Sequence, residues 1–257
     1  SEVELGETVE EVRRKVLDLN PRRIVFDSLS ELRLLAQDAL KYRRQVLALK
    51  QFFSTRGCTV WLLDDKTSQL GDLQLHSITH GVIELDQSVQ EYGTEQRRLR
   101  VIKMRGIKFA GGKHDFTLDT GGITVYPRLV AAAHRREFRN AAQSTGVKEL
   151  DALLGGGLVP GTSTLLVGPS GAGKTTTAIR CALSALQRGE NVKYLLFDET
   201  LGTLMSRSRQ LDMELDGYIE SGRLFLQQID PAEMSPGQFA MLVREAVEQD
   251  GASMVVI

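Results

Sequence analysis

Gly168-Pro-Ser-Gly-Ala-Gly-Lys-Thr175 is the segment that says most about the fold of this chain. It matches the phosphate-loop pattern, and the segments around it have the character that this pattern requires. An apolar segment at 163–167 predicts a strand before the loop, and residues 173–187 predict a helix after it. Strands and helices alternate in the rest of this half of the chain, which predicts an α/β domain with a mostly parallel sheet.

A loop of this kind binds polyphosphate through its backbone. Successive N–H groups surround the anion, glycine allows the positive φ angles and the close approach, and the next helix directs its positive end at the same charge. Lys174 is expected to reach the β- and γ-phosphates, and the Thr175 hydroxyl to bind Mg²⁺. The alternative is a chance glycine-rich turn. The candidate residues are Gly168, Ser170, Gly171, Ala172, Gly173, Lys174, Thr175 and Thr176.

Acidic residues follow two of the expected strands. Asp198 and Glu199 come after the strand expected at 192–197, and a carboxylate there can activate the water that attacks a γ-phosphate. Glu199 is the better candidate, while Asp198 or Thr200 could simply cap the next helix. Asp27 ends a short buried strand expected at 23–27. This is the position of a Walker-B acid, which holds Mg²⁺, and Asp27 could equally be the N-cap of the next helix.

Basic residues offer a weaker signal. Lys103 and Arg105 lie on one face of a strand expected at 99–105, where cations either reach a phosphate on a neighbouring subunit or face solvent. The clusters at 97–100 and 135–139 have no interleaved aromatic residues, so nucleic-acid binding is not expected. His76 and His80 have no cysteine or acid at ligand spacing, so a metal site is not expected there.

The composition is that of a soluble globular chain. The 257 residues are 42% hydrophobic and 25% charged, with 32 basic and 33 acidic residues. The apolar runs are far shorter than the ~20 residues of a membrane span, so no membrane partner is expected. The acidic beginning is unlike a secretory signal, and two cysteines fit a reducing compartment. The expected location is cytoplasmic.

The end of the chain resembles its beginning. With an offset of 231 residues, six of 25 positions are identical, among them Gly237 on Gly6 and Val243-Arg244 on Val12-Arg13. Two unrelated helix–strand units remain the alternative. A tandem repeat cut inside its unit predicts the second half of one unit at 1–128, a linker at 129–145 and the first half of the next unit at 146–257.

Together these motifs resemble the KaiC family of RecA-like ATPases. The resemblance covers nearly the whole chain and includes the segment Gly146–Leu158, Phe197-Asp-Glu-Thr200, Arg23-Ile-Val-Phe-Asp-Ser-Leu-Ser30 and the region from Arg98 to Ile123. It implies a RecA-like P-loop NTPase fold, with a mostly parallel sheet flanked by helices.

The resemblance also implies function. Lys174 and Thr175 would bind ATP and Mg²⁺, Glu199 would activate water, and Lys103 and Arg105 would reach ATP on a neighbour in a hexameric ring that signals through protein partners. Ser77 or Thr79 is the nearest counterpart of the residues that clock members of the family phosphorylate on themselves.

The two halves carry complementary parts of one site. The 18 residues from Arg128 to Thr145 can span up to ~60 Å when extended, which exceeds the ~45 Å width of a domain of this size. We therefore expect Asp27 to lie near Lys174 and Thr175, within one chain or between two, in a sheet completed in permuted order. A DNA-bound recombinase-like ATPase and a scaffold that ATP only holds together are the alternative functions.

Overall fold

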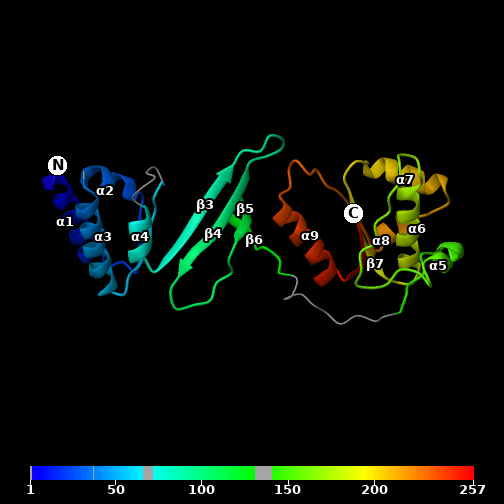
Figure 1. Cartoon of the computed structure of the whole chain (residues 1–257), viewed down its shortest axis with the longest axis horizontal. Helices are drawn as coiled ribbons and strands as arrows, with labels where there is room; N and C mark the ends of the chain where they lie inside the picture. Colours follow the sequence, from blue (N-terminus) through cyan, green and yellow to red (C-terminus); the bar gives the residue numbers. More distant parts are fainter. Residues whose placement is uncertain (1, 37, 66–71, 131–140) are drawn as a thin grey trace. The chain divides into compact units, whose positions relative to one another are not determined.

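The computed structural model describes residues 2–36, 38–65, 72–130 and 141–257 (Figure 1). These residues form two compact units. Unit 1 comprises Ser1–Ile83 with Val101–Ala110, and unit 2 comprises Glu84–Arg100 with Gly111–Ile257. These units are defined by which residues pack together. The boundaries predicted at 128 and 146 instead come from the suggested repeat, which the packing does not test, so they stay a prediction.

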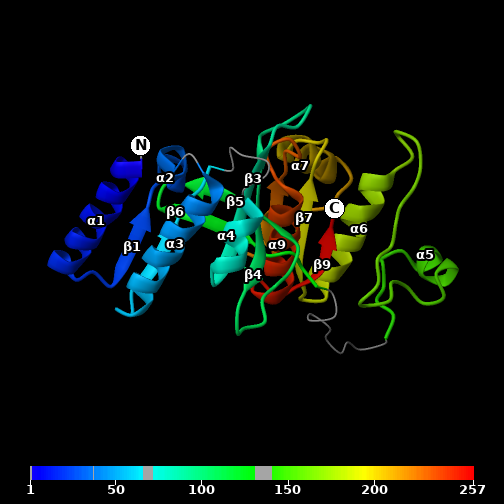
Figure 2. The same cartoon turned by 60° about the vertical axis from the view of Figure 1, so that its left-hand side comes forward.

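Unit 1 is a two-stranded parallel sheet with helices packed against it. Arg23 pairs with Thr59 and Phe26 with Leu62. The inward-facing residues of both strands join the apolar sides of the helices in one core. In the view of Figure 2, β1 is drawn between α1 and α3. Its elements are α1 (Glu2–Leu19), β1 (Arg23–Phe26), α2 (Leu29–Ala36), α3 (Ala39–Ser54), β2 (Thr59–Leu62) and α4 (Asp72–Ile78).

The apolar spacing of residues 31–55 predicts one long helix, but the structure has two helices there, α2 and α3. Asp38 has an extended backbone and its carboxylate accepts hydrogen bonds from the N–H groups of Leu40 and Lys41, at 2.8 and 3.0 Å. An aspartate in this position satisfies N–H groups that a helix start leaves free, so it begins a new helix. The apolar periodicity runs through both helices and does not reveal this break.

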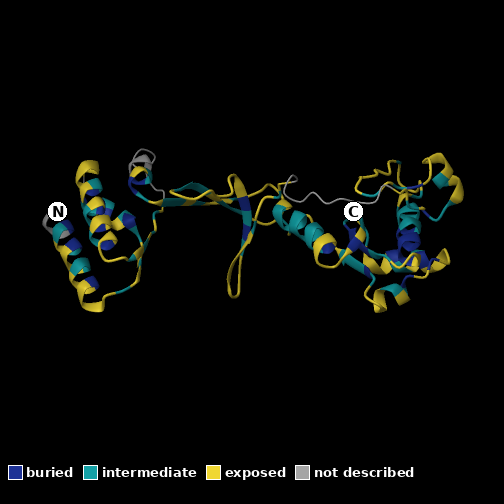
Figure 3. Cartoon of the chain, turned by 90° about the horizontal axis from the view of Figure 1, so that it is seen from below, coloured by how far each residue is buried: buried dark blue, intermediate teal, exposed yellow. Residues whose placement is uncertain are grey.

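Unit 2 contains a three-stranded parallel sheet in the order β8-β7-β9. Five of the six residues of β7 are buried, as expected for the central strand of a sheet covered on both faces. Ile179 and Leu186 of α6 are fully buried against this sheet, and Figure 3 shows the burial concentrated there. The elements are α5 (Lys148–Leu153), α6 (Lys174–Gln187), β7 (Asn191–Leu196), α7 (Leu201–Gln210), α8 (Asp216–Glu220), β8 (Leu224–Gln228), α9 (Pro236–Glu248) and β9 (Ala252–Val256).

The prediction of a strand at 163–167 is wrong, because these described residues are not in a strand. This segment has no ladder partner in the part of the chain that the structure describes, and Leu165 and Val167 are each 84% exposed. An apolar run becomes a strand only beside another strand that shares its hydrogen bonds. In the described sheet of unit 2, β8 and β9 each pair only with β7, so neither of their outer edges is joined to this segment.

A second, antiparallel sheet has the order β3-β4-β5-β6. The sequence predicts a hairpin here, because Thr120-Gly-Gly lies between apolar segments at 116–118 and 123–126. The hairpin is confirmed, because Asp119 pairs with Gly122 and Gly121 has a φ of 110°. Its strands are β3 (Gly81–Ser88), β4 (Gln96–Met104), β5 (Lys113–Asp119) and β6 (Gly122–Tyr126).

The predicted fold class is confirmed by this arrangement of parallel strands and flanking helices. The alanine and arginine content of residues 128–144 predicts some helical character in the linker. Residues 128–130 and 141–144 are not helical, and residues 131–140 lie outside the described residues. In the described part of the chain, no helix combines the length and the apolar character that crossing a membrane requires.

Candidate functional site

The phosphate loop ends where α6 begins. Gly171 and Gly173 have φ angles of 79° and 88°, in the left-handed region that favours glycine, so these two glycines are required by the turn. Gly173 occupies the N-cap position of α6, and no side chain of the described residues caps this end. The backbone N–H groups of the first turn of α6 are therefore available to an anion.

Lys174 folds back over this loop. Its ammonium donates to the carbonyls of Gly168 and Pro169, at 2.8 and 3.0 Å, and the side chain is exposed. Thr175 and Thr176 follow it in the first turn, both half-buried. The loop, the lysine and the helix start thus lie together as the sequence predicts.

The acidic pair divides into an exposed and a half-buried carboxylate. Asp198 is exposed, whereas the Glu199 side chain is 18% exposed and its Oε2 accepts a hydrogen bond from Arg207 Nη1 at 2.8 Å. The helix cap between them and α7 is Thr200, whose hydroxyl accepts from Thr203 N at 3.2 Å. Because Thr200 makes the cap, neither carboxylate is needed for it.

The negative charge of Glu199 affects the pKa of Tyr194 in β7. Burial first, and then the negative charge of Glu199, raises the pKa of Tyr194 to about 12, while Arg207 opposes this. The phenol therefore stays neutral at physiological pH. Near the end of β7, the half-buried carboxylate of Glu199 is thus paired with the guanidinium of Arg207.

Asp27 lies directly after β1 and is exposed, as a Walker-B acid would be. The sequence analysis missed its neighbours Asp64 and Asp65, which follow β2. Asp65 Oδ2 accepts from the hydroxyls of Ser28 and Ser30, at 3.2 and 2.8 Å. Because β1 and β2 are parallel, their carboxyl ends meet at one edge, and this rule could have pointed to the pair.

Lys103 and Arg105 contact the end of α4. Lys103 Nζ donates to the carbonyl of His76, Arg105 Nη2 donates to that of Ser77 at 2.7 Å, and Lys50 Nζ donates to that of Ile78 at 2.6 Å. Cations are favourable at the negative end of a helix. Partial desolvation first, and then the charges of Arg105 and Lys50, lower the pKa of Lys103. Three cations therefore converge at this helix end.

The two residues considered as phosphate acceptors differ in accessibility. Ser77 is exposed, whereas Thr79 is half-buried and its hydroxyl donates to the carbonyl of Leu75 at 3.1 Å. Ser77 is therefore the more accessible of the two.

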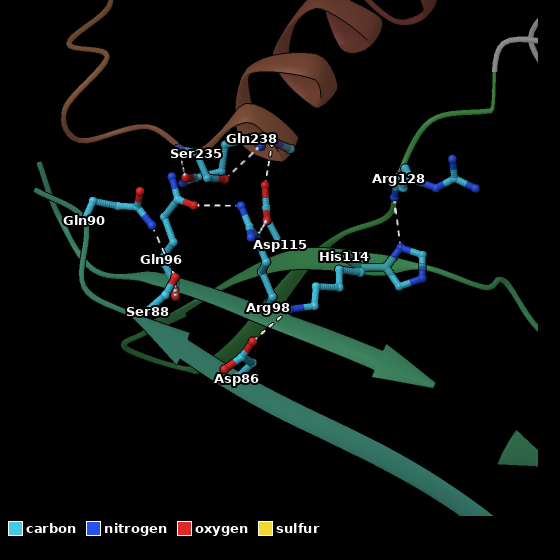
Figure 4. A network of polar contacts seen from close by, with 12 residues as sticks. Asp86, Ser88, Gln90, Gln96, Arg98, His114, Asp115, Arg128, Ser235 and Gln238 are labelled. Atoms are coloured by element: carbon cyan, nitrogen blue, oxygen red, sulfur yellow. Dashed lines mark hydrogen bonds and ion pairs between the residues drawn. The ribbon is translucent and has the colours of Figure 1, made fainter. Parts of the chain in front are cut away.

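A contact between β5 and α9 joins parts that are far apart in the sequence (Figure 4). Asp115 Oδ2 accepts from Gly237 N in the first turn of α9 at 2.8 Å, and Oδ1 accepts from Arg98 at 3.3 Å. Ser235 and Gln238 form a capping box at the same helix start. No sequence motif indicates this contact, although Gly237 is one of the residues that suggest a repeat.

The structure groups the candidate residues by unit. Unit 2 contains the phosphate loop with Asp198 and Glu199, and unit 1 contains Asp27, Lys103 and Arg105. The expected closeness of Asp27 and Thr175 stays a prediction. Among the described residues, no group of three or more histidine, cysteine, aspartate or glutamate side chains is placed to bind a metal ion.

These features define a RecA-like P-loop ATPase fold: a phosphate loop before a helix, acids after parallel strands and a helix-flanked sheet. A family model for the KaiC ATPase matches residues 1–130 and 143–257, so the chain belongs to the KaiC family. ATP binding is the function that this membership supports.

Individual relatives agree with this assignment. The circadian clock protein KaiC2 of Synechocystis is 25% identical over 263 residues, which cover 99% of this chain and 44% of that protein. The circadian clock oscillator protein KaiC of Prochlorococcus marinus is 21% identical, and the match covers 99% of this chain and 51% of that protein. The circadian clock oscillator protein KaiC of Synechococcus elongatus is 23% identical, and the match covers 83% of this chain and 41% of that protein. The chain thus spans about half the length of these relatives.

Proposed function

We propose that this chain binds ATP together with Mg²⁺ and hydrolyses it at the start of α6. The observation that carries the proposal is the glycine-lined loop that ends at an α6 N-terminus without a side-chain cap. Backbone N–H groups and the helix dipole then act on the same phosphates. Lys174 exchanges its contacts with Gly168 and Pro169 for the β- and γ-phosphates.

Glu199 is proposed as the general base, with Asp198 beside it. A base must accept a proton from the attacking water, and Glu199 is the carboxylate held by a defined partner, whereas Asp198 is exposed. The base action of Glu199 is expected to contribute about 10²–10⁴-fold to the rate.

Oxygen ligands are what Mg²⁺ prefers, and the Thr175 hydroxyl and the Asp27 carboxylate fit this donor set. Mg²⁺ typically keeps waters and phosphate oxygens and takes only one or two protein ligands, so a site of two side chains is sufficient. When bound, the ion neutralises charge on the phosphates. Asp27 acts there only when the two halves, in one chain or in two, form one permuted sheet.

Lys103 and Arg105 are proposed to reach ATP on a neighbouring subunit of a hexameric ring. The convergence of Lys50, Lys103 and Arg105 at the end of α4 supports an anion-binding role, since like charges repel and a bound anion relieves the repulsion. Ser77, exposed on the same helix end, is the preferred acceptor for autophosphorylation. The relatives' clock functions suggest signalling through protein partners.

The test of hydrolysis is ATP turnover by the chain and by Glu199→Gln. The proposal expects Glu199→Gln to keep ATP binding and lose turnover by at least 10²-fold. A scaffold held together by ATP would show no turnover in either chain, and a DNA-bound ATPase would be stimulated by single-stranded DNA in a salt-sensitive way. Asp27→Asn should raise the Mg²⁺ concentration for half-maximal turnover, and an unchanged Mg²⁺ requirement would remove Asp27 from the site.

A further inference from the structure

We propose that Arg207 is the positioning residue for Glu199. This inference rests on the proposed hydrolysis and adds a residue that the motifs do not include. Arg207 lies in the last turn of α7, two turns along from Glu199, which precedes the N-cap of the same helix. The ion pair of 2.8 Å therefore spans most of the helix and ties the carboxylate back along it.

Burial makes Glu199 dependent on this partner. Its side chain is only 18% exposed, and its second oxygen, Oε1, is buried without a hydrogen-bond partner in the described part of the chain. A buried carboxylate is tolerated only where a positive charge compensates it. Arg207 supplies that charge, so the position of the Glu199 carboxylate depends on Arg207.

The same pair orients the carboxylate. Arg207 occupies Oε2 and leaves Oε1 as the oxygen without a donor, and a general base needs such an oxygen to accept a proton. Without Arg207 the Glu199 side chain would no longer be held at Oε2 and would gain rotamer freedom. Arg207 thus acts on the rate through Glu199 and does not touch the nucleotide.

Arg209 provides a matched control on the same helix. It lies two residues after Arg207, is also in the last turn of α7, and pairs with Asp216 at 2.6 Å. Substitution of Arg209 removes a cation and an ion pair of similar length from α7 without contact to Glu199.

The experiment compares steady-state ATP turnover of the wild-type chain with Arg207→Met, Arg207→Lys and Arg209→Met, with folding checked by circular dichroism. We expect Arg207→Met to lower kcat about tenfold at an unchanged KM for ATP, since the rotamer freedom of Glu199 is restored. Arg207→Lys should recover part of kcat because it keeps the charge. Arg209→Met should match the wild type.

Two results would overturn this role. A kcat of Arg207→Met that equals or exceeds that of Arg209→Met would show that Arg207 does not position the base. A drop in kcat with a parallel rise in KM, equally large in Arg209→Met, would show a merely structural effect of α7. A wild-type chain that binds ATP without turnover would instead refute the proposed hydrolysis itself, and the role of Arg207 with it.

Discussion

Gly237 and Gly6 coincide when the sequence is shifted by 231 residues, yet alanine should act on them with opposite signs. An added Cβ at Gly237 would lie 2.7 Å from Asp115 Oδ2 and 2.9 Å from Asp115 Cβ. Around Gly6, in the interior of α1, an added Cβ would meet nothing within 4 Å. We therefore expect Gly237→Ala to destabilise unit 2 and Gly6→Ala to stabilise unit 1.

The magnitude follows from two opposing terms. In a helix, alanine is more favourable than glycine by about 0.5–1 kcal/mol, which is the whole expected gain for Gly6→Ala. At Gly237 the Asp115 side chain must withdraw, and the hydrogen bond from Gly237 N to this charged acceptor is lost. Such a bond stabilises by about 1.5–3 kcal/mol, so the expected balance for Gly237→Ala is a loss of about 1–2 kcal/mol.

Urea denaturation measures both effects. Trp61 is the only tryptophan in the sequence and lies in β2, so its fluorescence follows unit 1, while far-ultraviolet circular dichroism follows both units. Gly6→Ala should move the fluorescence transition to higher urea. Gly237→Ala should leave the fluorescence transition of unit 1 unchanged. It should move the circular dichroism transition of unit 2 to lower urea.

The control is the same pair of glycine substitutions in an Asp115→Ala background. Alanine at 115 removes the Oδ2 contact but keeps the Cβ that would lie 2.9 Å from the added methyl group, so Gly237→Ala should cost less there than in the chain with Asp115. In an Asp115→Gly background both contacts are absent, and Gly237→Ala should become stabilising, like Gly6→Ala. The reasoning is refuted if Gly237→Ala stabilises the chain that still contains Asp115, because Asp115 and α9 would then not be in contact.

Three further predictions concern stability and reactivity. Leu186→Ala, at a fully buried position of α6, should lower the free energy of unfolding by about 2–5 kcal/mol in urea titration, and a loss below 1 kcal/mol would contradict the described core. Hydrogen bonds from Ser144 and Thr145 lower the pKa of Asp151, so its stabilisation is present above about pH 4 and is lost as the pH falls through the lowered value. Asp151→Asn should therefore reduce the melting temperature more at pH 7 than at pH 2, and an equal reduction at both would exclude this cause. Burial raises the pKa of Cys181, so in a Cys58→Ser chain its thiol should react with a disulfide reagent more slowly than a free cysteine at pH 8, and equal rates would contradict that burial.

The parts of the fold that depend on local pattern could be predicted from the sequence. The phosphate loop requires glycine at Gly171 and Gly173 because of their φ angles, and the helix after it follows from apolar spacing. The hairpin at Thr120-Gly-Gly was predictable for the same local reason.

The parts that depend on distant partners could not be predicted. Leu165 and Val167 have the composition of a strand, but a strand also needs a neighbour, and composition does not report one. The break between α2 and α3 depends on the cap made by Asp38 within a continuous apolar pattern. The pairing of Glu199 with Arg207 is likewise invisible in a motif that ends at the acidic pair.

The central claim is that backbone N–H groups between Gly168 and Thr175 hold the phosphates of a nucleotide. Calorimetric titration of the chain with ATP, ADP and AMP in the presence of Mg²⁺, beside the Lys174→Ala chain, tests it most directly. The account predicts heat of binding with ATP and ADP, little with AMP, and a large loss of affinity in Lys174→Ala. The absence of binding by every nucleotide, or binding that Lys174→Ala leaves unchanged, would contradict it.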